Sequence, residues 1–301
     1  MFGYCFNYPA SESKLLYWLV TSLLLLSLFG CASGKAGKSS LLDTLRSLES
    51  TQSRHPAELE NIDILALNEN ARRFIDSRVS GVRDPYERVR ALRSAVFDAD
   101  GLGFSLNNEL TLTADETFEQ VRGNCVALAN FFVAAARHLG VDARFQELER
   151  NRQRGEQDID SGEEGFRVIE RHINVSGNII WRGRRARYVL DYLAVPEEDF
   201  GQSTIISDQR AFAHYYNNIA IQHLQQGELE TALQYLKKAI LEDDRVDFVW
   251  SNLGVVYARR GDYEATEFAY QRALDLNTEN PSARSNLRKL QKRQRIEPEQ
   301  G

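Results

Sequence analysis

The sequence predicts an α+β domain in roughly the first two thirds of the chain, followed by an all-α repeat module. Two observations support this prediction: an almost wholly apolar helix at 124–139 precedes several strand-like runs, and a residue pattern with a period of 34 follows residue 212. Of 301 residues 43% are hydrophobic, and only six are Pro and nineteen Gly, which excludes disordered and collagen-like chains. The 37 Lys+Arg and 43 Asp+Glu residues give a net charge of −6, so we expect no nucleic acid as a partner.

The N-terminus has the pattern of an export signal. A nearly unbroken apolar run covers Leu15 to Phe29, which is short for a membrane span of about 20 residues but suits the hydrophobic region of a signal peptide. Leu28-Phe29-Gly30-Cys31 resembles the lipobox of bacterial lipoproteins. The resemblance implies that residues 1–30 are cleaved off, that Cys31 is lipidated and that the protein is attached to the outer membrane. The alternative is an uncleaved anchor with an incidental cysteine.

The next segment, 31–56, is expected to be a tether with one short amphipathic helix. Within it, residues 32–39 fit a relaxed P-loop pattern. A P-loop needs a buried strand before the glycine-rich turn, whereas the run that precedes this segment carries the processing site. We therefore expect a flexible tether here, with no bound nucleotide, and no cofactor anywhere in the chain.

The α+β domain is predicted to span 57–196. Its expected elements are helices at about 65–80, 84–98 and 115–121, a buried helix at 124–139 stopped by Gly140, and strands at about 143–149, 166–176, 178–182 and 186–195. A polar loop at about 152–165 separates the first two strands. Its acidic residues 158–163 lack the glycine that an EF-hand turn requires, which favours a solvated loop over a metal site.

The repeat module is predicted to span 212–295. Tyr216, Ile219, Gly227, Ala232 and Ala239 are followed 34 residues later by Trp250, Leu253, Gly261, Thr266 and Ala273. This period is that of the tetratricopeptide repeat, a helix–turn–helix unit that often binds other proteins. The second unit is the closer match, and the third consists of one helix, about 281–294, that suits a cap. Since two and a half repeats are marginal alone, we expect the array to pack on the α+β domain or on a linker at 197–211.

Three residues of the α+β domain are candidates for catalysis. Cys125 follows Gly123-Asn124 at the start of the buried helix, and helix N-termini favour a thiolate. If export removes Cys5 and lipidation uses Cys31, Cys125 is the only remaining thiol. His172 lies in a strand and Asp191 lies among apolar residues, where a carboxylate is costly unless it is paired. Each residue taken alone also fits a structural role. Gln120 could donate to an oxyanion but equally fits a helix surface.

These residues and their surroundings resemble the transglutaminase-like superfamily of cysteine enzymes. The resemblance covers about 84–195 and includes Thr113-Ala114-Asp115-Glu116-Thr117, Arg122-Gly123-Asn124-Cys125, Arg171-His172-Ile173-Asn174-Val175 and Val189-Leu190-Asp191. It implies a papain-like fold in which the buried helix packs on an antiparallel sheet. It further implies that Cys125 is the nucleophile, His172 the general base and then acid, and Asp191 the residue that orients the imidazole. The aromatic residue that often follows the histidine closely is missing.

The resulting hypothesis is a lipid-anchored enzyme of the bacterial envelope that faces the periplasm. Members of the superfamily attack an amide carbonyl and form a thioester, which water or an amine then resolves. We favour hydrolysis of a peptide or isopeptide bond over cross-linking, with a peptide or protein as substrate, a protein partner in the repeat groove and the membrane bound through the lipid. The alternative from another class is a catalytically silent adaptor.

Overall fold

A computed structural model describes residues 62–150, 159–160, 167–168, 171–191 and 200–296. The predicted signal, lipidation site, tether and P-loop-like segment lie outside the described residues, as does most of the predicted loop at 152–165. Among the helices that the structure does describe, none is both long and apolar enough to cross a membrane.

Three of the predicted helices have caps that the sequence encodes locally. Helix α2 (Glu69–Val79) is capped by Asn68, and α3 (Pro85–Phe97) is capped by Asp84 with Pro85 at its first position. Helix α4 (Ala114–Gln120) begins with a capping box between Thr113 and Glu116. Between these helices the short strands β1 (Ser105–Leu106) and β2 (Arg122–Gly123) pair in parallel.

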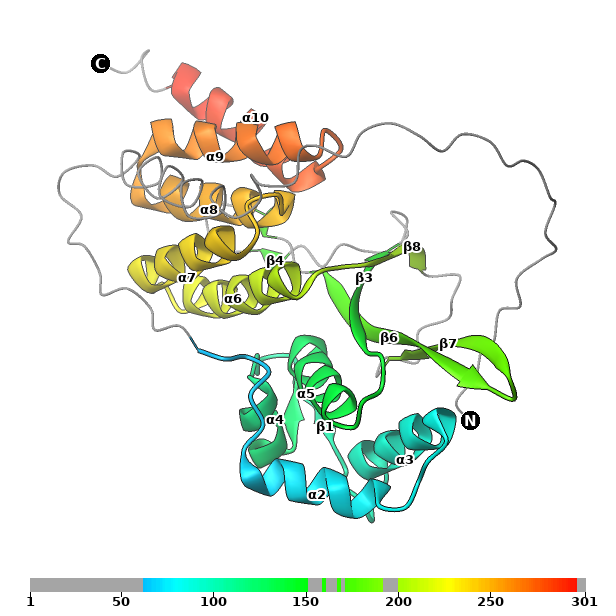
Figure 1. The fold of residues 1–301 in the computed structure, drawn as a ribbon. Helices are drawn as coiled ribbons and strands as arrows, with labels where there is room; N and C mark the ends of the chain where they lie inside the picture. Colours follow the sequence, from blue (N-terminus) through cyan, green and yellow to red (C-terminus); the bar gives the residue numbers. More distant parts are fainter. Residues whose placement is uncertain (1–61, 151–158, 161–166, 169–170, 192–199, 297–301) are drawn as a thin grey trace, which may run out of the picture.

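Helix α5 (Cys125–His138) forms the centre of the first domain. Every residue from 126 to 136 is buried, as its uniformly apolar sequence predicts. The helix lies between strand β6 on one side and helices α2, α3 and α4 on the other (Figure 1). It ends at His138 with Leu139 as the C-cap, and Gly140 follows with a φ of 70°, a left-handed conformation that favours glycine.

The main sheet is antiparallel and has the strand order β7-β6-β3-β8. Its strands are β3 (Arg144–Arg150), β6 (His172–Trp181), β7 (Arg184–Leu190) and β8 (Phe200–Ile205). The structure corrects two expectations about this sheet, one for the segment 197–211 and one for Gly177. The segment 197–211 is not merely a linker, because β8 lies within it and pairs with β3. A small separate hairpin, β4 (Ile159–Asp160) with β5 (Arg167–Val168), comes before β6.

The second correction concerns Gly177, where we predicted a break between two strands. Strand β6 instead runs through this position, and Gly177 pairs with Tyr188 of β7. A side chain at Gly177 would collide with the carbonyl oxygen of Asp142 and with the ring of Tyr188. The glycine therefore permits a close approach within a continuous strand. The expected turn at Gly183 is confirmed: Arg182 and Gly183 both have positive φ, as a two-residue hairpin requires.

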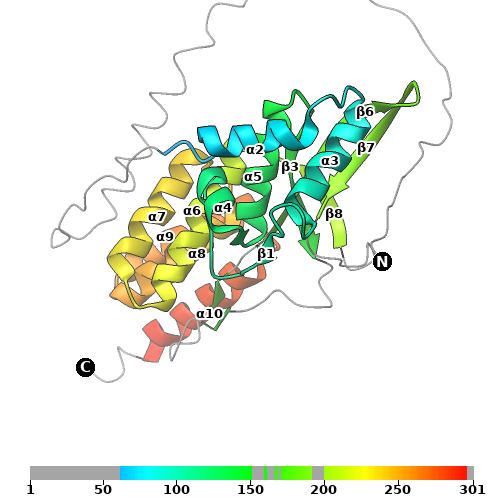
Figure 2. The same cartoon turned by 90° about the horizontal axis from the view of Figure 1, so that it is seen from below.

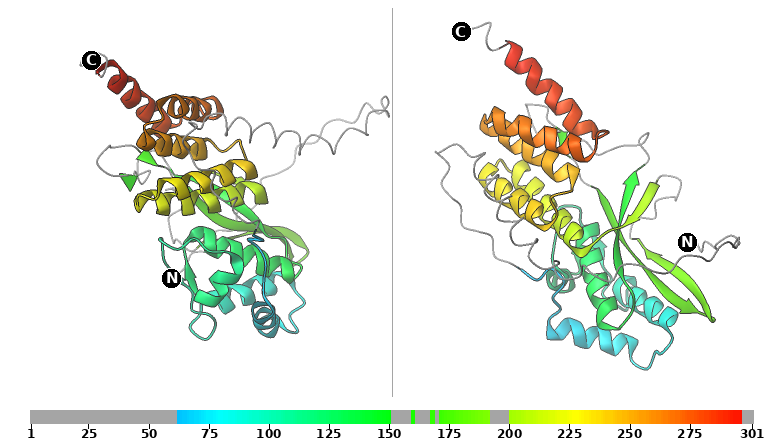
Figure 3. Two further views of the ribbon diagram at one scale, coloured as in Figure 1. Left: turned by 90° about the vertical axis from the view of Figure 1, so that its left-hand side faces the viewer. Right: turned by 45° about the horizontal axis from the view of Figure 1, so that its top comes forward.

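The C-terminal region is a stack of five helices. These are α6 (Asp208–Gln225), α7 (Leu229–Glu242), α8 (Asp247–Arg260), α9 (Tyr263–Leu276) and α10 (Pro281–Ile296). The predicted core residues Trp250, Leu253, Tyr257 and Ala273 are all buried, which confirms the 34-residue register. Helix α10 forms the outer end of the stack (Figure 3).

The repeat helices pack directly on the first domain, as we expected. Helix α6 contacts α5 and β3, while β5 contacts α8 and α10. Figure 1 shows α6 and α7 between the first domain and the outer repeat helices, and Figure 2 shows the same arrangement from below. The side chain of Gln222 in α6 donates a hydrogen bond of 3.2 Å to Thr111 of the first domain. The two parts of the chain are thus joined by polar contacts as well as by apolar packing.

Candidate active site

Cys125 is the first residue of α5 and is half-buried, with no disulfide partner. The preceding Asn124 fixes this position in two ways: its side chain accepts a hydrogen bond from the backbone N–H of Ala127 at 3.0 Å and donates one to Thr111 at 2.7 Å. A side chain at Gly123 would meet the Cβ of Ala127 at 2.5 Å, so only glycine fits there without a shift. The Gly-Asn-Cys sequence therefore encodes the tight entry that puts the cysteine at the N-terminus of the helix.

His172 and Asp191 meet at neighbouring ends of β6 and β7. Nε2 of His172 lies 2.9 Å from one carboxylate oxygen of Asp191 and 3.0 Å from the other. Asn174, which follows on the same face of β6, donates a third hydrogen bond to Asp191 at 3.0 Å. The side chains of His172 and Asp191 are only 7% and 18% exposed, so this contact is largely shielded from water. The contact with Asp191 uses Nε2, so Nδ1 of the imidazole is not the nitrogen that binds this carboxylate.

The electrostatic surroundings of His172 favour the imidazolium. Burial by itself lowers the pKa of this histidine, but hydrogen bonds to Asp191 and to the Cys125 side chain, together with the charges of both groups, raise its pKa to about 10. Both Asp191 and Cys125 contribute to the raised pKa of His172. Cys125, His172 and Asp191, which lie far apart in the sequence, are thus neighbours in the structure.

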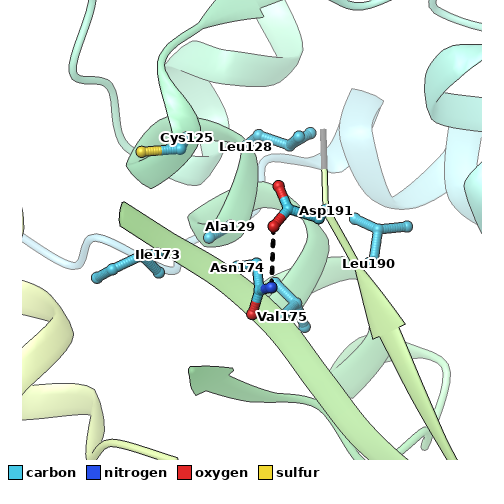
Figure 4. A pocket seen from close by; sticks show the side chains of 8 residues that line it. All are labelled: Cys125, Leu128, Ala129, Ile173, Asn174, Val175, Leu190 and Asp191. Carbon is cyan, nitrogen blue, oxygen red and sulfur yellow. Dashed lines mark hydrogen bonds between the residues drawn. The ribbon is translucent and has the colours of Figure 1, made fainter. Parts of the chain in front are cut away.

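A small pocket lies between α5 and the sheet beside Cys125. It is lined by Cys125, Leu128, Ala129, Ile173, Asn174, Val175, Leu190 and Asp191. Figure 4 shows Asn174 bonded to Asp191, with Cys125 at the start of the helix opposite. The cavity of about 10 Å³ has room for a group the size of one water molecule. A reacting carbonyl must therefore approach the sulfur from the open side of this pocket.

The other histidines of the described residues have partners elsewhere. His138 bonds to Asp76, His214 to Glu147 and His223 to Glu228. His55 lies outside the described residues. Gln120 is exposed at the end of α4, in keeping with the helix-surface interpretation. Of the acidic loop at 158–163, only the backbone of Ile159–Asp160 is described, as strand β4.

The sequence analysis did not identify Asn174 or Arg171 as residues that support the site. Asn174 lies two residues after His172, and this spacing of two within a strand could have indicated a shared face. Arg171 immediately precedes the histidine and donates hydrogen bonds to Glu147 of β3 at 2.7 Å and to Asp247 of α8 at 3.1 Å. Asp247 belongs to the repeats, so no local signal in the sequence could have predicted this pair.

Models of two protein families match separate parts of this chain. The sequence profile of the transglutaminase-like superfamily matches residues 72–170, which include Cys125 but end before His172 and Asp191. Tetratricopeptide repeat profiles match residues 213–244 and 248–280.

The curated relatives match a smaller part of this chain. "Photosystem I assembly protein Ycf3" of Synechococcus elongatus is 34% identical over 82 residues, which are 26% of this chain and 46% of that protein. The protein of the same name from Prochlorococcus marinus is 30% identical over 83 residues, 27% of this chain and 47% of that protein. The chain thus spans just under half the length of these relatives. The family matches and the α+β fold together show that the chain contains a transglutaminase-like domain followed by two tetratricopeptide repeats.

Proposed function

We propose that the chain is a cysteine acyl-transfer enzyme that uses Cys125, His172 and Asp191 to hydrolyse a peptide or isopeptide bond. The observation that carries the proposal is the hydrogen bond between His172 and Asp191 beside the Cys125 side chain. In this arrangement Nε2 of the imidazole binds the Asp191 carboxylate, and the ring also interacts with the Cys125 side chain. A nucleophile, a base and a group that orients the base are the minimum for covalent catalysis at a carbonyl.

The reaction follows from these positions. Transfer of the thiol proton to His172 gives the imidazolium, the state that the raised pKa of His172 favours, and the sulfur of Cys125 attacks the amide carbonyl to give a tetrahedral oxyanion. Collapse of this intermediate breaks the C–N bond while the imidazolium donates its proton to the leaving amine, which leaves a thioester on Cys125. Water then attacks the thioester, His172 takes its proton, and the acid is released with the thiol restored. In this proposal the backbone N–H groups at the start of α5 stabilise the oxyanion.

Asp191 has two roles in this proposal. It fixes the orientation of the imidazole, and its charge stabilises the imidazolium during the reaction. Asn174 holds the Asp191 carboxylate in turn. Attack by an amine in place of water would give a cross-linked product by the same steps, and we favour water because it is the more abundant nucleophile.

We also propose that the protein is held at the bacterial outer membrane by a lipid on Cys31 and faces the periplasm. Support comes from the apolar run 15–29 and the lipobox-like Leu28-Phe29-Gly30-Cys31. In that compartment unpaired cysteines are uncommon, which fits a chemical use for Cys125.

A second candidate function is that of a catalytically silent adaptor. The repeats, and the partial similarity to two proteins named for photosystem I assembly, favour this candidate. An electrophilic probe that labels active cysteine enzymes separates the two functions. The enzyme proposal predicts rapid labelling of the wild type and none in Cys125→Ala, whereas an adaptor predicts labelling of Cys125 no faster than that of an ordinary thiol.

A further inference from the structure

His172 begins strand β6, and its backbone position in the sheet is described on the side of β3. On one side, His172 pairs with Leu148 of β3, the last pair in that register. On the other side, the described pairing of β6 with β7 begins only at Val175 and Leu190. Among the described residues, the strand end that carries the proposed base pairs with β3, and side-chain contacts add to its positioning.

Arg171 supplies a side-chain anchor that reaches into the repeats. Its guanidinium donates to Oε1 of Glu147 at 2.7 Å and to both carboxylate oxygens of Asp247 at 3.1 Å. It also lies over the ring of Phe248, 5.2 Å from the ring centroid. The side chains of Glu147 and Asp247 are 5% and 6% exposed, so these ion pairs are shielded from solvent. The guanidinium thus bridges two carboxylates, with Nη1 on Glu147 and Nη2 on Asp247, through charge-assisted hydrogen bonds that are stronger than neutral ones.

Asp247 is itself fixed from within the repeat array. It is the first residue of α8, where the helix dipole favours a negative charge. Its Oδ2 accepts hydrogen bonds from Asn277 at 2.8 Å and from Asn280 at 2.9 Å. Asn280 is fully buried and also caps the start of α10 by accepting from Ala283. The carboxylate that holds Arg171 is therefore locked by residues from the end of α9 and the start of α10.

Glu147 extends the same cluster to α6. Its Oε2 accepts hydrogen bonds from Arg210 at 2.8 Å and from His214 at 3.1 Å. Although burial alone raises the pKa of this carboxyl, the bonds from His214 and Arg210 and the charge of Arg171 lower it well below its usual range. Full burial lowers the pKa of His214, which favours the neutral imidazole. Glu147 is thus a carboxylate held by two arginines from different parts of the chain.

From these contacts we infer that the repeats are part of the catalytic unit: Asp247 is a positioning residue that acts through Arg171 on His172. This inference rests on the proposed function, because it concerns the orientation of the proposed base. It assigns the second repeat a role in the reaction besides any recruitment of a partner. A shift at the junction of α8, α9 and α10 would reach the active site through the side chains of Asp247 and Arg171.

The test measures how fast iodoacetamide alkylates Cys125 between pH 5 and pH 9. It uses the full-length protein in detergent, and mass spectrometry of the Cys125 peptide excludes signals from other cysteines. The proteins compared are the wild type, His172→Ala, Asp247→Asn, Arg171→Lys and Asp262→Ala. Asp247→Asn keeps the side-chain shape, and Arg171→Lys keeps a positive charge beside Glu147 but cannot pair with both partners through a planar fork. Asp262→Ala is the matched control, because it removes the cap of α9 in the same repeat without touching Arg171.

The inference predicts that Asp247→Asn and Arg171→Lys both lower the rate at pH 6 by about tenfold and move the acidic limb of the profile toward that of His172→Ala. Asp262→Ala should lower the melting temperature but keep the wild-type profile. Wild-type profiles in both folded variants would overturn the inference, and so would an equal shift in Asp262→Ala. If Asp247→Asn does not fold, the alkylation profile of Arg171→Lys alone tests the inference, and a wild-type profile in that variant would overturn it. Identical profiles for wild type and His172→Ala would instead refute the proposed function itself.

Discussion

The imidazole of His172 and the carboxylate of Asp191 are in hydrogen-bond contact although 19 residues separate them in sequence, with 2.9 Å between Nε2 and the nearer oxygen. The two-residue turn at Arg182 and Gly183 makes this contact possible, because it folds β7 back along β6 in antiparallel register. The pair lies where the two strands end, next to the start of α5.

Asp191→Asn should weaken the enzyme without abolishing it. The amide keeps the shape of the side chain but loses the charge that stabilises the imidazolium, so the base survives with poorer orientation. We expect a fall in kcat of about 10²- to 10⁴-fold with a smaller change in KM, measured on any substrate that the electrophilic probe screen identifies. Loss of turnover as complete as in Cys125→Ala would contradict the orienting role.

Stability should fall in mild acid because of the cluster around Glu147. The pKa of Glu147 is lowered in the folded state, so its contribution is present above the ordinary value of about 4.3 and is lost as the pH falls. The pKa of His214 is also lowered, so below about pH 6.5 the unfolded chain binds a proton that the folded chain does not. His172 has the opposite sign: its pKa of about 10 stabilises the fold below about pH 6.5, and this contribution declines toward pH 10.

Melting temperatures between pH 4 and pH 8 check this account. The wild type should lose stability from about pH 6.5 downward, and His214→Gln should show a smaller slope between about pH 6.5 and pH 5 because the histidine is gone. His223→Gln is the control, since His223 is partly exposed and bonds to Glu228 at the surface. Equal slopes in wild type and His214→Gln would show that His214 does not titrate on unfolding.

The core of the second repeat should depend on Trp250. Its side chain is 1% exposed, and its indole nitrogen donates to the carbonyl oxygen of Asp244 at 2.8 Å. Replacing it with Ala should lower the free energy of unfolding by about 3–5 kcal/mol, measured by denaturant titration. Phe268 contacts the same ring but is 39% exposed, so Phe268→Ala is a control that should cost clearly less. Unchanged stability in Trp250→Ala would show that the repeat register is wrong.

The proposed lipid anchor has a direct test in the mass of the mature protein. We expect protein extracted from membranes to begin at Cys31 and to carry added lipid mass, and we expect Cys31→Ser to leave the membrane fraction. A mature chain that retains Met1, or unchanged membrane attachment of Cys31→Ser, would refute the lipoprotein proposal.

The parts of the fold that the sequence predicts well are those encoded locally. Caps at Asn68, Asp84 and Thr113 mark helix starts, and the 34-residue period predicts the repeat helices. Gly177 was wrongly interpreted as a strand break, because a glycine required for close packing has the same local pattern as one that ends a strand. Strand β8 was missed because Gly201, Gln202 and Ser203 give it little strand propensity, and its pairing with β3 is what makes it a strand.

The candidate site was likewise predictable from the sequence only in part. Cys125, His172 and Asp191 could be proposed from the sequence because each has an unusual local setting. The pairing of Arg171 with Asp247 could not, because 76 residues separate the partners and each alone resembles an ordinary surface charge. Long-range ion pairs of this kind depend on how the two parts of the chain pack, and nothing in the local sequence pattern of either partner indicates that packing.

The most direct test of the central claim is the rate at which iodoacetamide alkylates Cys125 at pH 6, compared between the wild type and His172→Ala. An ordinary cysteine has a pKa of about 8.5 and is almost entirely a thiol at this pH. In the wild type the raised pKa of His172 keeps a positive charge beside the sulfur, so we expect Cys125 to react at least about tenfold faster than in His172→Ala. Equal rates in the two proteins would contradict the claim that His172 activates Cys125.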